Sequence, residues 1–172
     1  MRIFVMFGTQ DKRFDRLLNA ILNSNFVNEN EVYVQLGYTK GDYSGINGQE
    51  YYTEDELNHQ IEIADLIITH AGVGAIVSAL KLKKRVIVVP RLGQYKEQNN
   101  DHQVQIMERF DKQGYIIPCT DLSKLDETVN NAYNFEPKEY VADKQGIIDE
   151  ITDFINCIKT VSYTHLTLPT IA

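Results

Sequence analysis

The sequence lacks several features by which common functional classes are recognised. Its two cysteines, Cys119 and Cys157, lie far apart and outside any CxxC or Cys/His spacing, which excludes the usual zinc and redox motifs and leaves two reduced thiols. No run approaches the roughly 20 apolar residues that span a bilayer. Residues 1–7 follow a strand-like pattern and lack the parts of a signal peptide, so we expect a cytoplasmic protein.

Basic residues are also scarce. The 172 residues include 17 Lys and Arg against 24 Asp and Glu, which gives a formal charge of -7. This charge argues against unaided binding to nucleic acid or to anionic lipid, so any membrane partner must be reached through another protein. With 43% hydrophobic residues, the chain has the size and composition of one globular domain.

The end of the chain differs from the rest. Residues 161–172 are rich in threonine and break the charged, helical pattern that precedes them, as translated vector sequence does. We predict one domain over residues 1–159 and a non-native or disordered tail over residues 160–172.

Two hydrophobic patterns alternate along the domain. Runs rich in β-branched residues predict strands at residues 2–7, 31–36, 49–52, 65–69, 85–89 and 115–117. Segments of helical period predict helices at residues 14–22, 54–63, 75–82, 100–112, 122–132 and 145–158. Thr53 and Glu56 form a capping box at the start of the second helix. The alternation predicts an α/β fold with a doubly wound, mostly parallel sheet and helices on both faces.

The loop after the first strand is the first candidate for chemistry, because ligands of open α/β sheets bind beyond the carboxyl ends of the strands. Gly8 permits a close backbone approach, and Thr9 offers a hydroxyl where the next helix begins. A turn glycine followed by a polar cap is the alternative interpretation of these two residues.

The loop after the fourth strand, residues 69–75, consists of small residues and opens a helix. Free amides and the positive helix end favour an anion there, and a diphosphate fits. Gly72 and Gly74 lack the third glycine of a dinucleotide fingerprint, and no P-loop lysine follows them. A tight packing turn is the alternative. His70 is either a structural imidazole or a contact to phosphate or sugar.

The loop after the fifth strand leads into five consecutive polar residues, 99–103. Carboxamide and carboxylate groups suit the vicinal hydroxyls of a sugar, because each hydroxyl needs both a donor and an acceptor. Capping of the next helix by Asn100 or Asp101, with solvated neighbours, is the alternative.

Three segments in this order give the chain a specific resemblance to a known family. They are IFVMFGTQDKRFDRLL, ITHAGVGAIVSALKLKKRVIVVPR and EQNNDHQVQ. Together they resemble the family-28-type glycosyltransferase C-terminal domain, over nearly the whole chain to about Ile158. The resemblance is strongest to the stand-alone subunits of bacterial capsule and exopolysaccharide clusters. It extends to the catalytic subunit of the eukaryotic two-part UDP-N-acetylglucosamine transferase.

The resemblance implies the Rossmann-like half of a GT-B glycosyltransferase that holds a UDP-sugar. A membrane-anchored acceptor-half subunit would recruit it to the inner face of the plasma membrane, where a lipid-linked glycan receives the hexose. The implied diphosphate contacts are Gly8, Thr9, His70, Gly72 and Gly74, and the implied sugar contacts are Glu97, Asp101, His102 and Gln103. Ser78 replaces a glutamate that binds the ribose in many relatives.

The expected reaction is an inverting transfer that needs no metal and no cofactor. Loop amides and the helix end stabilise the departing UDP, and Asp101 or His102 is the candidate base unless the partner supplies it. No DxD pair is present, since Asp42 and Asp55 are isolated. A non-catalytic nucleotide-sugar-binding or activating subunit is the main alternative. A Rossmann-type oxidoreductase or epimerase is disfavoured by the missing glycine fingerprint.

The predicted helix at residues 145–158 carries an apolar stripe of five isoleucines and one phenylalanine. We expect this stripe to pack mainly on the sheet, and an exposed part of it is the alternative contact to the membrane subunit.

Overall fold

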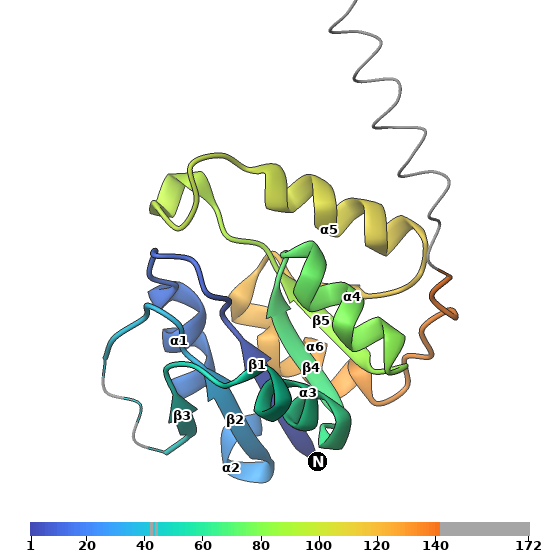
Figure 1. Cartoon of the computed structure of the whole chain (residues 1–172), viewed down its shortest axis with the longest axis horizontal. Coiled ribbons are helices and arrows are strands. Elements are labelled where there is room, and N and C mark those ends of the chain that lie inside the picture. The colour runs from blue at the N-terminus through green and yellow to red at the C-terminus, as the bar shows by residue number, and fades with distance from the viewer. Residues whose placement is uncertain (42, 44, 142–172) are drawn as a thin grey trace, which may run out of the picture. The chain divides into compact units, whose positions relative to one another are not determined.

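The computed structural model describes residues 1–41, 43 and 45–141 of the chain. One sheet of six strands runs through it in the order β3-β2-β1-β4-β5-β6, and every neighbouring pair is parallel (Figure 1). The strands are β1 (Arg2–Met6), β2 (Glu31–Gln35), β3 (Asn47–Gln49), β4 (Leu66–His70), β5 (Arg85–Val89) and β6 (Ile117–Pro118). The chain order of the strands reverses between β1 and β4, which makes that place the switch point of the sheet.

Helices cover both faces of this sheet. They are α1 (Asp15–Leu22), α2 (Phe26–Glu29), α3 (Glu54–Ile63), α4 (Val73–Lys81), α5 (His102–Lys112) and α6 (Leu125–Ala132), with short 3₁₀ turns at Gly93–Tyr95 and Leu122–Lys124. Side chains alternate along β1: Ile3 and Val5 pack in the core under α1 and α6, and Phe4 and Met6 pack in the core under α3, α4 and α5. The doubly wound α/β fold is therefore confirmed.

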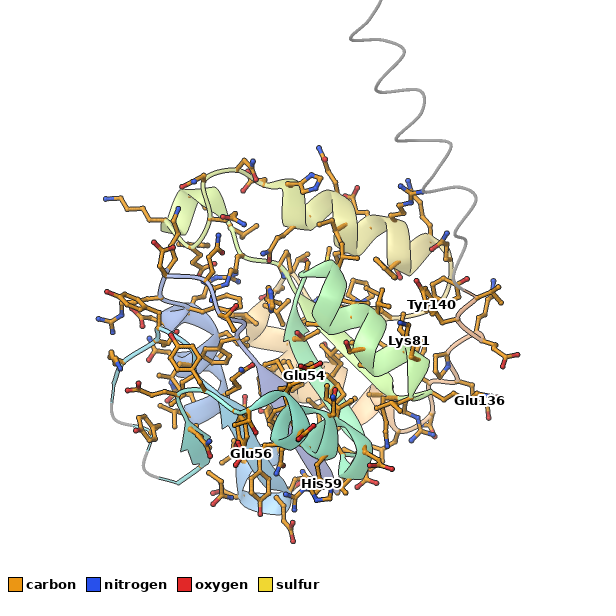
Figure 2. The ribbon with its side chains drawn as sticks, viewed as in Figure 1. Glu54, Glu56, His59, Lys81, Glu136 and Tyr140 are labelled. Atoms are coloured by element: carbon orange, nitrogen blue, oxygen red, sulfur yellow. The ribbon has the colours of Figure 1, made fainter. Side chains whose placement is uncertain are left out.

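The start of α3 follows its sequence closely. The Thr53 hydroxyl accepts from the Glu56 amide at 3.3 Å, and the Glu56 carboxylate accepts from the Thr53 amide at 2.9 Å. Figure 2 shows Glu56 on α3 and Lys81 at the end of α4, where a cation complements the helix dipole. The capping box and the bounds of α3 are as the sequence predicts.

Several bounds differ from the prediction. The edge strand β3 lies at Asn47–Gln49 instead of residues 49–52, and it pairs only with β2. The segment 122–132 begins as a 3₁₀ turn, because the Asp121 carboxylate holds the Ser123 amide at 3.0 Å. The short helix α2 was not predicted, and residues 145–172, with the last helix and the tail, lie outside the described residues.

The remaining features concern cysteine, metal and membrane. Cys119 is a buried free thiol whose pKa is raised by burial, and Cys157 lies beyond the described part of the chain. Within residues 1–41, 43 and 45–141, no three His, Cys, Asp or Glu side chains cluster as metal ligands do. Among the same residues, no helix is both long and apolar enough to cross a membrane.

Candidate functional site

The carboxyl edge of the sheet brings the loops after β1, β4 and β5 together at the switch point. The loop after β1 runs from Phe7 to α1, the loop after β4 is Ala71–Gly72, and the loop after β5 runs from Pro90 to α5. In open α/β sheets this position is where ligands bind. Three of the predicted diphosphate contacts meet here.

His70, the last residue of β4, is held between two glycines. A Cβ on Gly8 would lie 2.6 Å from His70 Cε1, and a Cβ on Gly72 would also collide with the ring. Gly8 has a φ of +85°, which side-chain-bearing residues rarely adopt. The structure thus brings Gly8, His70 and Gly72 into direct contact, and only glycine fits on either side of the imidazole.

The His70 imidazole is neutral at physiological pH. Burial, together with the charge of the nearby Arg91 guanidinium, lowers the pKa of His70 to about 4, although a hydrogen bond with the Met6 carbonyl opposes the shift. Thr69, its neighbour on the strand, sends its hydroxyl to the Met6 carbonyl at 3.3 Å. A neutral imidazole carries one N–H, and the hydrogen bond with the Met6 carbonyl uses it, so His70 adds no charge and no further N–H donor to the site.

The N-terminus of α4 is open. Its N-cap is Gly72, no side chain caps it, and its first turn contains no acidic residue. The start of α3 is the opposite case, with Thr53 as cap and three acidic residues in the first turn. A Cβ on Gly74 would meet nothing within 4 Å, and Ser78 is exposed on the next turn of the helix. The positive end of α4 is therefore free to receive an anion.

Gln103 ties two of the loops together. It is 6% exposed, and its Oε1 accepts from the Ala71 amide at 3.2 Å and from the Arg91 amide at 3.0 Å. Its amide nitrogen has no hydrogen-bond partner among the described residues, so this group is the part of Gln103 that remains for a ligand.

The side chain of Glu97 does not lie at the solvent-accessible surface of the carboxyl edge. It is 3% exposed, and its carboxylate accepts from Arg16 at 3.0 and 3.1 Å and from the Leu92 amide at 3.1 Å. The expected contact between Glu97 and the donor sugar does not match this arrangement, because both oxygens are already engaged inside the protein. The observed role of Glu97 is to hold the loop after β5 against α1.

Asp101 and His102 lie at the start of α5 and are exposed. The Asp101 carboxylate accepts from the Gly93 amide at 2.8 Å and makes no capping bond to the helix, although Asp101 occupies the N-cap position. His102 Nδ1 lies 3.2 Å from Gln105 Oε1 on the same helix. Both side chains keep solvent access.

The loops after β1 and β5 are also bridged at their outer ends. Gln10 Nε2 donates to Gln98 Oε1 at 2.8 Å, and Lys12 Nζ donates to Asn99. Thr9, directly before Gln10 in the chain, is exposed. A hollow of about 430 Å³ lies beside the bridge and is lined by Lys12, Arg13, Asp15, Arg16, Tyr95, Lys96 and Glu97.

Arg91 is the part of the site that sequence reasoning missed. Its side chain is 0% exposed and donates to four main-chain carbonyls, those of Phe7, Lys12, Arg13 and Glu97. Burial lowers the pKa of Arg91 to about 10, so the guanidinium is still charged at neutral pH. The one available signal was an arginine directly after a fully apolar strand and a proline.

Comparisons with known proteins identify relatives of the whole domain. The family model described as Glycosyltransferase family 28 C-terminal domain matches residues 2–158. A UDP-N-acetylglucosamine transferase subunit ALG13 from Candida albicans is 37% identical over 78 residues, which are 45% of this chain and 25% of that protein. The human protein of the same name is 33% identical over 70 residues, 41% of this chain and 6% of its own length.

A bacterial relative matches over a longer stretch. The UDP-N-acetylglucosamine--N-acetylmuramyl-(pentapeptide) pyrophosphoryl-undecaprenol N-acetylglucosamine transferase 3 of Bacillus cereus is 27% identical over 169 residues, 90% of this chain and 46% of that protein. The chain spans less than half the length of each of these relatives. Among solved structures, the NMR structure of ALG13 matches with a TM-score of 0.58 at 19% identity, over 87% of this chain and 94% of that one, which supports the fold.

Proposed function

The chain belongs to the glycosyltransferase family 28 C-terminal domain family, and from this premise we propose that it is the UDP-sugar-binding subunit of a two-part hexosyltransferase. The observation that carries the proposal is the open α4 N-terminus beside a neutral His70 that is packed between Gly8 and Gly72. A diphosphate suits this place, because amides and a helix end provide donors for its oxygens.

The donor contacts follow from the positions of the loops. The diphosphate lies against Gly8, Thr9, His70, Gly72 and Gly74, where a backbone can approach closely. The ribose lies toward the exposed Ser78, and the free amide nitrogen of Gln103 faces the hexose. Glu97 supports the loop from inside and does not touch the sugar.

The names of the relatives support a particular donor and acceptor. Both the ALG13 subunits and the Bacillus cereus enzyme are named as N-acetylglucosamine transferases, so we take UDP-N-acetylglucosamine as the first donor to test, before UDP-glucose and UDP-galactose. The name of the Bacillus cereus enzyme contains a pyrophosphoryl-undecaprenol group, which supports a lipid-linked glycan acceptor. Capsule or exopolysaccharide synthesis is the process we propose for this chain.

We propose that the acceptor half belongs to another chain. A complete GT-B enzyme has two Rossmann-like domains, and the described residues supply one sheet of six strands. We propose a membrane-anchored partner that binds the acceptor and holds this subunit at the inner face of the plasma membrane. The word subunit in the name of the ALG13 relatives supports a two-part arrangement.

The proposed mechanism is an inverting attack of the acceptor hydroxyl on the anomeric carbon, in which UDP leaves with the electrons of the broken bond. The α4 end and the loop amides stabilise the new charge on UDP. The Asp101 carboxylate or the His102 imidazole takes the proton of the acceptor hydroxyl, because both side chains are exposed at the same edge. No metal is required in this mechanism.

The second candidate function is a binding or activating subunit without catalytic residues. It is favoured by the placement of Glu97, whose carboxylate is sequestered by Arg16. It is also favoured by Asp101, whose carboxylate is held by the Gly93 amide. In that case the partner supplies the base, and this chain supplies donor binding alone.

The two candidates are separated by a transfer assay with the full chain and its membrane partner. Transfer of labelled hexose from the UDP-sugar into the lipid-extractable fraction is measured for wild type, His70→Ala, Asp101→Ala, His102→Ala and His59→Ala. His59 lies exposed on α3 (Figure 2) and is the matched control for His70. Enzyme function predicts strong loss in His70→Ala and in Asp101→Ala or His102→Ala, and none in His59→Ala. A binding subunit predicts loss in His70→Ala and normal transfer in both Asp101→Ala and His102→Ala. Normal transfer in all of these variants contradicts the proposed site.

A further inference from the structure

Arg91 gathers the main chain of two loops around one buried guanidinium. Nη2 donates to the Phe7 carbonyl at 2.8 Å, and Nη1 donates to the carbonyls of Lys12, Arg13 and Glu97 at 3.0 to 3.3 Å. The loop after β1 and the loop after β5 are thus both held by hydrogen bonds to the side chain of Arg91, which lies just after β5. The guanidinium carbon also lies 4.6 Å from the centre of the Phe14 ring, a cation–π contact.

These bonds determine where loop amides point. In a trans peptide the C=O and the following N–H point in opposite directions, and the described residues contain no cis peptide bond. Because the Phe7 carbonyl points at Arg91, the Gly8 amide points away from the buried guanidinium. The Gly8 amide has no acceptor among the residues that the structure describes, and the Cα of Gly8 packs on His70.

We propose that Arg91 is a positioning residue of the donor site. From the protein interior it binds the Phe7 carbonyl and holds the two loops, and in this way it turns the Gly8 amide toward the diphosphate. The inference rests on the proposed function, since it concerns how this same site grips the diphosphate of a UDP-sugar. Arg91 itself is fully buried and does not touch the ligand.

Arginine is suited to this task for two reasons. Its planar fork presents several N–H donors in fixed directions, so a single side chain serves four carbonyls, which a lysine ammonium with three donors cannot do in the same geometry. The guanidinium also stays charged in the protein interior, and the carboxylate of Glu97 that acts on it is itself paired with Arg16. A positive charge below the diphosphate adds long-range attraction to the amide contacts.

The test measures binding of UDP and of uridine to the full-length chain by calorimetry, for wild type, Arg91→Met and Arg91→Lys. The matched control is Lys84→Met, because Lys84 also donates to two main-chain carbonyls, of Glu62 at 2.6 Å and Ala64 at 2.9 Å, at the opposite edge of the sheet. Melting temperatures are recorded for all four proteins. The shift of the Gly8 amide on addition of UDP is followed in the ¹⁵N-labelled chain by NMR.

We expect UDP affinity to fall about 10- to 100-fold in Arg91→Met, the range for loss of one hydrogen bond to a charged group, with uridine affinity unchanged within about twofold. Arg91→Lys recovers part of the loss, and Lys84→Met loses stability without a change in binding. The Gly8 amide of the wild type moves on addition of UDP. If Arg91→Met does not fold, Arg91→Lys and the wild-type Gly8 signal carry the test.

Three results overturn the inference. They are a Gly8 amide that does not respond to UDP, wild-type UDP affinity in the Arg91 variants, and equal losses for UDP and uridine. Absence of UDP binding to the wild type is a different outcome, because it refutes the proposed function itself.

Discussion

Protonation of His70 tests the structure of the site, because its neighbours in the folded protein keep the imidazole neutral. In the unfolded chain the imidazole titrates with a pKa near the ordinary 6.5, whereas burial and the charge of Arg91 lower the pKa of the folded state to about 4. The perturbation is a change of pH from 7 to 4, applied to wild type and to His70→Gln. Glutamine does not titrate, so the difference between the two proteins isolates this residue.

The sign follows from proton binding. Above pH 6.5 both states hold a neutral imidazole, and His70 contributes no pH dependence. Between pH 6.5 and about 4 only the unfolded state takes up the proton, so folding stability falls as the pH falls. At about 1.4 kcal/mol for each pH unit between these two pKa values, the loss attributable to His70 is about 3 kcal/mol.

The assay is urea unfolding of both proteins at half-unit steps from pH 7 to pH 4. We expect the free energy of unfolding of the wild type to fall more steeply, with the extra loss of about 3 kcal/mol complete near pH 4. Other titrating groups act equally in both proteins and cancel. Parallel pH curves for the two proteins refute the assignment of a buried, neutral His70.

Five further substitutions test separate parts of the structure by urea unfolding and UDP calorimetry. Gly74→Ala should stabilise α4 by about 0.5 kcal/mol yet weaken UDP binding. Gly8→Ala should lower the free energy of unfolding by about 1–3 kcal/mol and also weaken UDP binding, because Gly8 has a φ of +85° and packs against His70. A Gly8→Ala protein that is more stable than the wild type contradicts this packing. Glu97→Ala should lower the free energy of unfolding by about 3 kcal/mol, because it leaves Arg16 without its buried partner. Asp15→Ala, which removes an exposed ion pair, should lower it by less than about 1 kcal/mol. Equal losses in the two variants contradict the role of Glu97 in holding the loop. Thr53→Ala should cost about 1 kcal/mol through loss of the α3 cap, with UDP binding unchanged.

Local signals in the sequence were sufficient for much of the fold. The capping box of Thr53 and Glu56 fixed the start of α3, because both partners of that interaction lie within one turn. The apolar strands β1, β4 and β5 were recognisable because central parallel strands are buried on both faces. The edge strand β3 was misplaced by two residues, since a strand paired on one side has little hydrophobic pattern.

The site was predictable only in part, because its decisive contacts join distant segments. The sequence identified the loops of Gly8, His70 and Gly72, and small residues after a strand are a local signal. It gave no indication that Glu97 is paired with Arg16, which lies 81 residues away, nor that a single arginine would bind carbonyls on two loops. From sequence alone a charged residue is predicted to be exposed, because charged side chains are rarely buried unless they are paired.

The central claim is that the carboxyl edge between β1 and β4 binds the diphosphate of a UDP-sugar. The most direct measurement is calorimetric titration of the full-length chain, together with its membrane partner, with UDP-N-acetylglucosamine, for wild type and for Gly72→Val. A side chain at Gly72 collides with His70 and covers the start of α4. We expect saturable binding to the wild type that Gly72→Val abolishes. Equal binding by both proteins, or no binding of any UDP-hexose to the wild type, contradicts it.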